Sequence, residues 1–155
     1  MATGTVTYNS GFGDNGFTPN VVPISGARAA VIERLSNING LNADLVFENS
    51  FYKNNNLRSY IRLLFTPEAF EDGINVKKKT QRGEITFQIN TRIGLGALPS
   101  NALADIVESA FLQGTNFANS QWRIAITQTS RSEGVNSDAF WWLNELVVAY
   151  IATQV

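Results

Sequence analysis

The chain has 155 residues, enough for one domain with a sizeable core, and its net charge of −1 argues against a dedicated nucleic-acid binder, which usually carries a basic excess. It contains no cysteine and no histidine, which excludes disulfides and thiolate metal sites and removes the commonest general base and zinc ligand. No stretch approaches 18 continuous apolar residues, and the N-terminus lacks the basic and apolar regions of a signal peptide. The composition therefore predicts no cofactor, no metal site and no membrane partner.

Residues 1–23 are rich in Gly, Thr, Asn and Ser, and we interpret them as an N-terminal arm. Within the arm, Gly11-Phe12-Gly13-Asp14-Asn15-Gly16 formally matches the dinucleotide fingerprint GxGxxG. That fingerprint works where a helix starts directly after it within a βαβ unit, and the sequence that follows predicts neither. A small ligand-binding domain or enzyme that uses this loop is therefore the remote alternative.

Residues 24–155 predict a single α+β domain. Its first helix is expected to run from an N-cap at Ser25 to about Asn37. A short apolar run at 44–48 predicts a strand, and the Asn-rich stretch 49–56 predicts a loop. Ala27, Ala30, Val31 and Leu35 give this helix a modest apolar stripe, and Arg28, Glu33 and Arg34 are expected to face outward.

The clearest strand runs from Gly83 to Gly94, where apolar and polar residues alternate with period two. A second strand is predicted at Ser59–Phe65. The polar connection 66–82 predicts a long hairpin whose tip projects from the body, with the only close carboxylates, Glu68, Glu71 and Asp72, in a loop. The basic residues of this hairpin protect an edge or lie in solvent, or they contact a partner protein or passing DNA; they are Lys77, Lys78, Lys79 and Arg82.

The best helix is expected from an N-cap at Ser100 to Gly114. Its apolar stripe has the i, i+3, i+4, i+7 spacing of one buried face, which we expect to pack on the dry side of the 83–94 strand. The members of the stripe are Leu103, Ile106, Val107, Ala110 and Phe111, and the expected partners are Ile85, Phe87 and Ile89.

Two further strands are predicted at Gln121–Thr127 and Phe140–Thr153, with a turn at 130–138 between them. Both parities of the last strand are apolar, which predicts a central strand with both faces covered, or with one face buried by another subunit. Trp141 and Tyr150 are candidates for that subunit interface, with ordinary core as the alternative.

No residue pattern points to catalysis. Glu145 lies within the apolar last strand, where a carboxylate needs a partner, and Arg123 on the preceding strand is the expected one. In the absence of a catalytic pattern, we expect no enzyme and no catalytic residue.

The fold class that these elements predict is α+β, with a mixed, mainly antiparallel sheet, two amphipathic helices packed on one face and a long projecting hairpin.

From residue 24 to 153, the order of these elements resembles the tail terminator (tail completion) proteins of long-tailed bacteriophages, the lambda-terminator-like family. The arm and the Asn-rich loop look like additions to the family pattern. The segments that carry the resemblance are Tyr60-Ile61-Arg62-Leu63, Gly83 to Thr91, Ala102 to Gly114, Trp122-Arg123-Ile124 and Trp141-Trp142-Leu143.

The resemblance implies a structural virion protein, assembled in the host cytoplasm and placed at the head-proximal end of the tail. Members of the family form a hexameric ring that caps the tail tube, stops its polymerisation and joins it to the head–neck complex. The implied partners are other copies of the chain, the tail tube protein, a neck or head-completion protein, and passing genomic DNA, held loosely and without sequence specificity. The alternatives within the same class are a neck or connector ring and a tail tube subunit.

Overall fold

The computed structural model describes residues 27–47, 50, 52–53, 58–72, 79–94, 97–136 and 140–155, with the backbone alone at 67–72, 79 and 97. The arm 1–23, its GxGxxG loop and residues Lys77 and Lys78 lie outside this part of the chain. In chain order the described elements are α1 (Ala27–Ser36), β1 (Asp44–Val46), β2 (Tyr60–Asp72), β3 (Lys79–Arg92), α2 (Ala97–Ala110), β4 (Asn116–Ala118), β5 (Trp122–Arg131), β6 (Val135–Asn136) and β7 (Trp141–Gln154).

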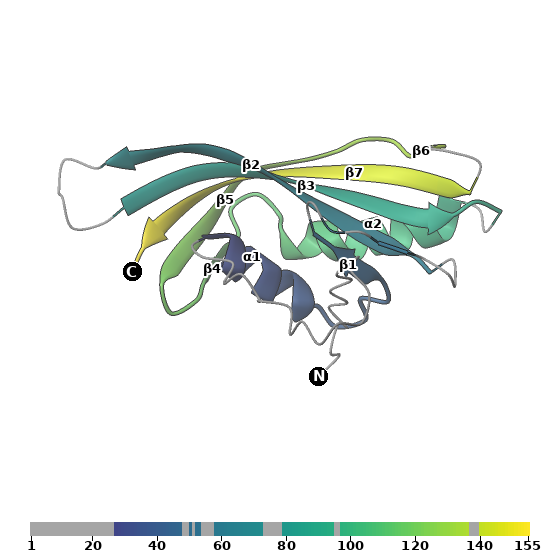
Figure 1. The fold of residues 1–155 in the computed structure, drawn as a ribbon, viewed down its shortest axis with the longest axis horizontal. Coiled ribbons are helices and arrows are strands. Elements are labelled where there is room, and N and C mark those ends of the chain that lie inside the picture. Colours follow the sequence, from purple (N-terminus) through teal and green to yellow (C-terminus); the bar gives the residue numbers. More distant parts are fainter. Residues whose placement is uncertain are drawn as a thin grey trace, which may run out of the picture.

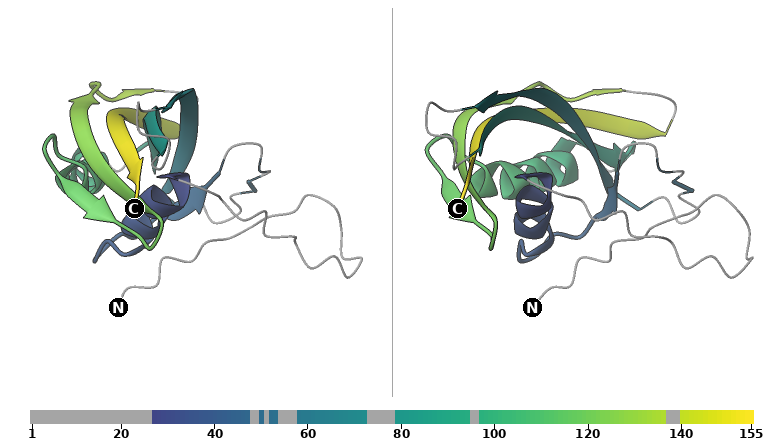
Figure 2. Two further views of the ribbon diagram at one scale, coloured as in Figure 1. Left: turned by 90° about the vertical axis from the view of Figure 1, so that its left-hand side faces the viewer. Right: turned by 60° about the vertical axis from the view of Figure 1, so that its left-hand side comes forward.

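The strands form one curled, mixed sheet in the order β1-β2-β3-β7-β5-β4, with β6 beside β7. Only β1 and β2 are parallel, and the other described pairs are antiparallel. Both helices lie in the hollow of the sheet, on one face, while the β2–β3 hairpin extends from one end (Figures 1 and 2). The α+β class, the mainly antiparallel sheet and the packing of both helices on one face are confirmed.

The core lies between the helices and the hollow face of the sheet. The alternation in β3 places Ile85, Phe87 and Ile89 in this core, all with no exposed surface. The ring of Phe111, just after α2, lies 5.0 Å from that of Phe87, so α2 packs on β3 as predicted. The expected stripe of α1 is also buried, although Arg34, expected to face outward, donates a hydrogen bond from Nε to the carbonyl of Ala110.

Helix α2 begins three residues before the predicted N-cap. Ser100 is inside the helix, fully buried, and its hydroxyl accepts a hydrogen bond from the side-chain amide of Asn144 on β7. Pro99 lies in the first turn of the helix, where a proline is tolerated because its missing N–H has no intrahelical partner. The N-cap prediction for Ser100 is therefore wrong.

The two strands of the hairpin extend further into the 66–82 connection than predicted. Strand β2 continues through Pro67 to Asp72, so Glu68, Glu71 and Asp72 belong to a strand and not to a loop. Proline is tolerated there because β1 pairs only with the first residues of β2, and a bulge follows between Pro67 and Phe70. Gly83, expected at a strand end, lies within β3.

The end of the chain also departs from the predicted pattern. Strand β5 runs to Arg131, past the start of the predicted turn, and β4 and β6 were not predicted. A bulge between Ile126 and Gln128 shifts the pairing of β5 with β7 by one residue. Strand β7 lies between β3 and β5, which confirms the central position predicted from its two apolar parities.

Candidate functional site

The side of the sheet opposite the helices, which we call the open face, has no described helix over it (Figure 1). Its central row comes from β7, and Leu143, Val147, Ala149 and Ile151 are all partly exposed there. Polar residues of β3 flank this row, with Thr86 opposite Val147. This row is apolar except for Glu145, and such a partly exposed apolar row fits contact with another protein better than permanent exposure to water.

Glu145 lies on the open face, and its predicted pairing with Arg123 is wrong. The register places Glu145 opposite Gln88, whose amide nitrogen donates a hydrogen bond of 2.9 Å to the carboxylate. Arg123 lies opposite Thr153, near the other end of β7. The carboxylate is therefore paired with an amide of β3, a contact that period-two patterning alone does not specify.

The hairpin lies at the end of the sheet that contains the last residues of β7. Thr80 pairs with Thr153, and Arg82 is exposed on the open face opposite Ile151. Lys79 is the first residue of β3, and the strand register places its backbone opposite that of Asp72 on β2. The interaction role of the basic group Lys77, Lys78, Lys79 and Arg82 stays a prediction.

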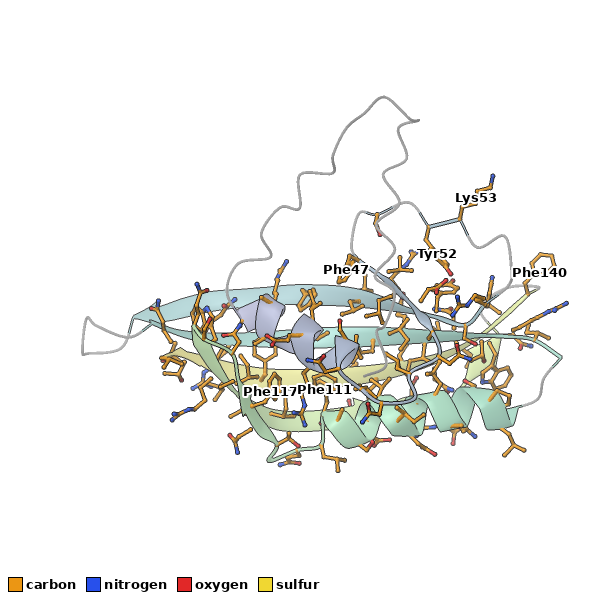
Figure 3. All side chains as sticks on the ribbon, turned by 90° about the horizontal axis from the view of Figure 1, so that it is seen from below. Phe47, Tyr52, Lys53, Phe111, Phe117 and Phe140 are labelled. Carbon is orange, nitrogen blue, oxygen red and sulfur yellow. The ribbon has the colours of Figure 1, made fainter. Side chains whose placement is uncertain are left out.

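Trp141 lies at the opposite end of the sheet, at the start of β7. Its ring is 5.0 Å from that of Tyr60, edge to face, and the ring of Tyr60 is 4.9 Å from that of Tyr52. The Tyr52 hydroxyl donates a 2.7 Å hydrogen bond to Asp44, and burial together with this bond raises the pKa of Tyr52. Figure 3 shows Tyr52 and Phe140 on this side of the molecule. Three rings in a row with a partly exposed Trp are typical of a protein interface, so the interface role of Trp141 stays a prediction.

Tyr150 has a different environment. Its side chain is 3% exposed and belongs to the core, on the same face as the helices. The ring covers Gly83, the residue opposite it on β3. The single chain thus gives Tyr150 the core position that was the alternative to an interface, and an interface role for it stays a prediction.

On the helix side of the sheet, charged side chains of β5 and α2 form ion pairs with each other. Arg131 donates from Nη1 to Asp105 at 2.5 Å and to Glu108 at 3.1 Å, which ties β5 to α2. The hydrogen bond to Asp105 raises the pKa of Arg131, with burial acting in the opposite direction. Within the described residues there is no group of three or more acidic, His or Cys side chains placed to hold a metal ion. No helix in the same part of the chain is long and apolar enough to cross a membrane.

No protein-family model and no curated protein matches the chain. Among solved structures, a protein that has no functional name has a TM-score of 0.61 at 19% sequence identity, over 81% of this chain and 92% of its own. A chain from the virion of a native gene transfer agent particle has a TM-score of 0.50 at 13% identity, over 83% of this chain and 95% of its own. At these identities the likeness shows a shared fold that extends over nearly the whole of both neighbours.

Proposed function

We propose that this chain is a structural virion protein, and specifically a tail terminator that forms a ring of six copies. The observation that carries the proposal is the fold shared with a chain of a gene transfer agent virion, over 83% of this chain. The element order and segments that resemble the phage tail terminators support the narrower assignment. The protein then acts by binding, without catalysis, at the head-proximal end of the tail.

A closed ring needs two different surfaces on each subunit, one for each neighbour. The fold offers such a pair, because the projecting hairpin and the aromatic row of Tyr52, Tyr60 and Trp141 lie at opposite ends of the same sheet. The apolar row of the open face adds a third surface that association would cover. In the finished tail, one side of the ring would bind the last layer of tube protein and the other would bind the neck.

The first test is the mass of the purified protein in native conditions, with and without tail tubes. A discrete species of six subunits, or a monomer that binds tube ends, supports the proposal. A monomer that stays monomeric at high concentration and does not bind tubes contradicts it.

Addition to elongating tube protein separates the alternatives. A terminator stops growth when it is present at a few copies per tube end, a tube subunit is incorporated along the length, and a neck ring binds only to tubes that are already capped. A charge at the centre of the open face, Val147→Lys, is expected to prevent assembly while the monomer still folds. Ser109→Lys, on the exposed side of α2, is the matched control and should assemble normally.

A further inference from the structure

A groove of about 350 Å³ lies between α1, the end of α2 and β4. One wall consists of Ala30, Glu33 and Arg34 of α1, and Asn37 and Ile38, just after the helix, extend it. The opposite wall is β4, with Phe117, and the carboxyl end of α2 contributes Ala110. Figure 3 shows Phe117 and Phe111 between α1 and α2. The volume is at the low end of the usual range for small-ligand pockets.

Arg34 is the polar centre of this groove. Its Nε is fixed by the 2.6 Å hydrogen bond to the Ala110 carbonyl, and its guanidinium lies over the ring of Phe117, 4.8 Å from the centroid. Among the described residues, its two Nη groups have no hydrogen-bond partner. A half-buried guanidinium that is held in place and has donors to spare is suited to bind a carboxylate.

Strand β4 offers a backbone edge to the same groove. Thr115 accepts from the amide of Ile126, and the amide of Asn119 donates to Trp122, each at 2.9 Å. In an antiparallel ladder every second residue bonds to the partner strand, so Ala118, between these positions, presents its N–H and C=O away from β5. Within the described residues β5 is the one strand that pairs with β4, so an extended segment can add to this edge.

We propose that this groove binds the segment Gly11–Phe17 of the chain's own N-terminal arm. Only residues 24–26 separate the arm from Ala27, the first residue of α1, and α1 forms one wall of the groove. Asp14 is the one acidic residue before Ala27, and it complements Arg34. In an extended segment Phe12 and Asp14 project to the same side, so the ring meets the apolar wall while the carboxylate meets the guanidinium.

The chain length permits this contact. The residues between Asp14 and Ala27 span up to about 40 Å when extended, whereas Ala27 and Arg34 are separated by about 10 Å of helix. The arm can therefore reach the groove of its own chain or that of an adjacent copy. This proposal gives the GxGxxG-like loop a role in protein contact, with glycines that allow close approach to the β4 backbone.

Disulfide trapping in the full-length chain tests the proposal. Because the chain has no native cysteine, only the two introduced cysteines can form a disulfide. In Asn15→Cys/Asn37→Cys, the second cysteine replaces an exposed residue that lines the groove. We expect rapid cross-linking under mild oxidation, and a non-reducing gel shows whether the bond lies within one chain or between two. The control, Asn15→Cys/Gln128→Cys, places the second cysteine at an exposed position of β5 and should cross-link slowly.

Charge changes then test the recognition. Asp14→Asn is expected to lower the cross-linking rate about tenfold, the effect of losing one charge-assisted bond. Arg34→Glu should do the same, and Asp14→Arg with Arg34→Glu should restore the rate. Glu33→Gln removes a repulsive carboxylate from the groove and should not lower it. Equal rates in the groove pair and the control pair, or no response to Asp14→Asn, would overturn the proposal.

Discussion

Replacement of Gly83 by alanine tests how β3 and β7 pack in the core. A methyl group there would lie 2.5 Å from Cζ and 2.9 Å from Cε1 of Tyr150, closer than real contacts of a Cβ atom. The Tyr150 side chain is only 3% exposed, so making room for the methyl group requires movement within a packed core. Such overpacking costs about 1–3 kcal/mol, while loss of glycine's backbone freedom in the unfolded chain returns about 0.5–1 kcal/mol. We expect the free energy of unfolding to fall by about 1–2 kcal/mol.

Urea denaturation followed by tryptophan fluorescence measures this change. The decisive comparison is the same substitution in a Tyr150→Leu background, which removes the ring atoms that the methyl group would meet. There Gly83→Ala should be neutral, or should stabilise by up to about 1 kcal/mol. If alanine destabilises both backgrounds equally, the cost comes from the strand backbone and the reasoning from the ring contact is refuted.

Two further substitutions test the contacts that fix α2 to the sheet. Arg131→Met should lower the free energy of unfolding by about 1 kcal/mol. Asp105→Asn should change it by less than about 0.5 kcal/mol, because the Asp105 side chain is 69% exposed. Thermal melts at low and high salt distinguish the effects of these two variants. Asn144→Ala leaves the buried Ser100 hydroxyl without its partner and should cost about 1–3 kcal/mol, of which the double variant with Ser100→Ala recovers part, as a double-mutant cycle will show.

The parts of the fold that the sequence predicted are those set by local periodicity. The alternation around Phe87 and the helical stripe that ends at Phe111 each define a buried face, and the two faces meet because each needs apolar cover. The two apolar parities around Val147 likewise predicted a central strand. In each case burial depends on a repeat that can be read within a dozen residues.

The wrong predictions concern features set by tertiary pairing. The partner of Glu145 depends on which strand lies beside β7 and on the register, and the bulge after Ile126 is not visible in a period-two pattern. Pro67 is tolerated within β2 because β1 pairs only with Tyr60–Arg62, so β1 requires no backbone N–H at position 67. The groove around Arg34 was missed for the same reason, since β4 and the end of α2 complete it from distant parts of the sequence. Arg34 next to an apolar helical stripe was the signal that could have indicated it.

The position of β7 in the sheet has a consequence for how the protein folds. This strand follows all the others in the sequence, yet it separates β1-β2-β3 from β5 and β4. The strands that pair with β7 are remote in sequence, as in the pairing of Thr80 with Thr153. The chain must therefore lose the conformational entropy of closing long loops before the two parts of the sheet can pair. During synthesis the two halves must wait with exposed strand edges until β7 leaves the ribosome, and a chain shortened before β7 would have two half-sheets and no common core.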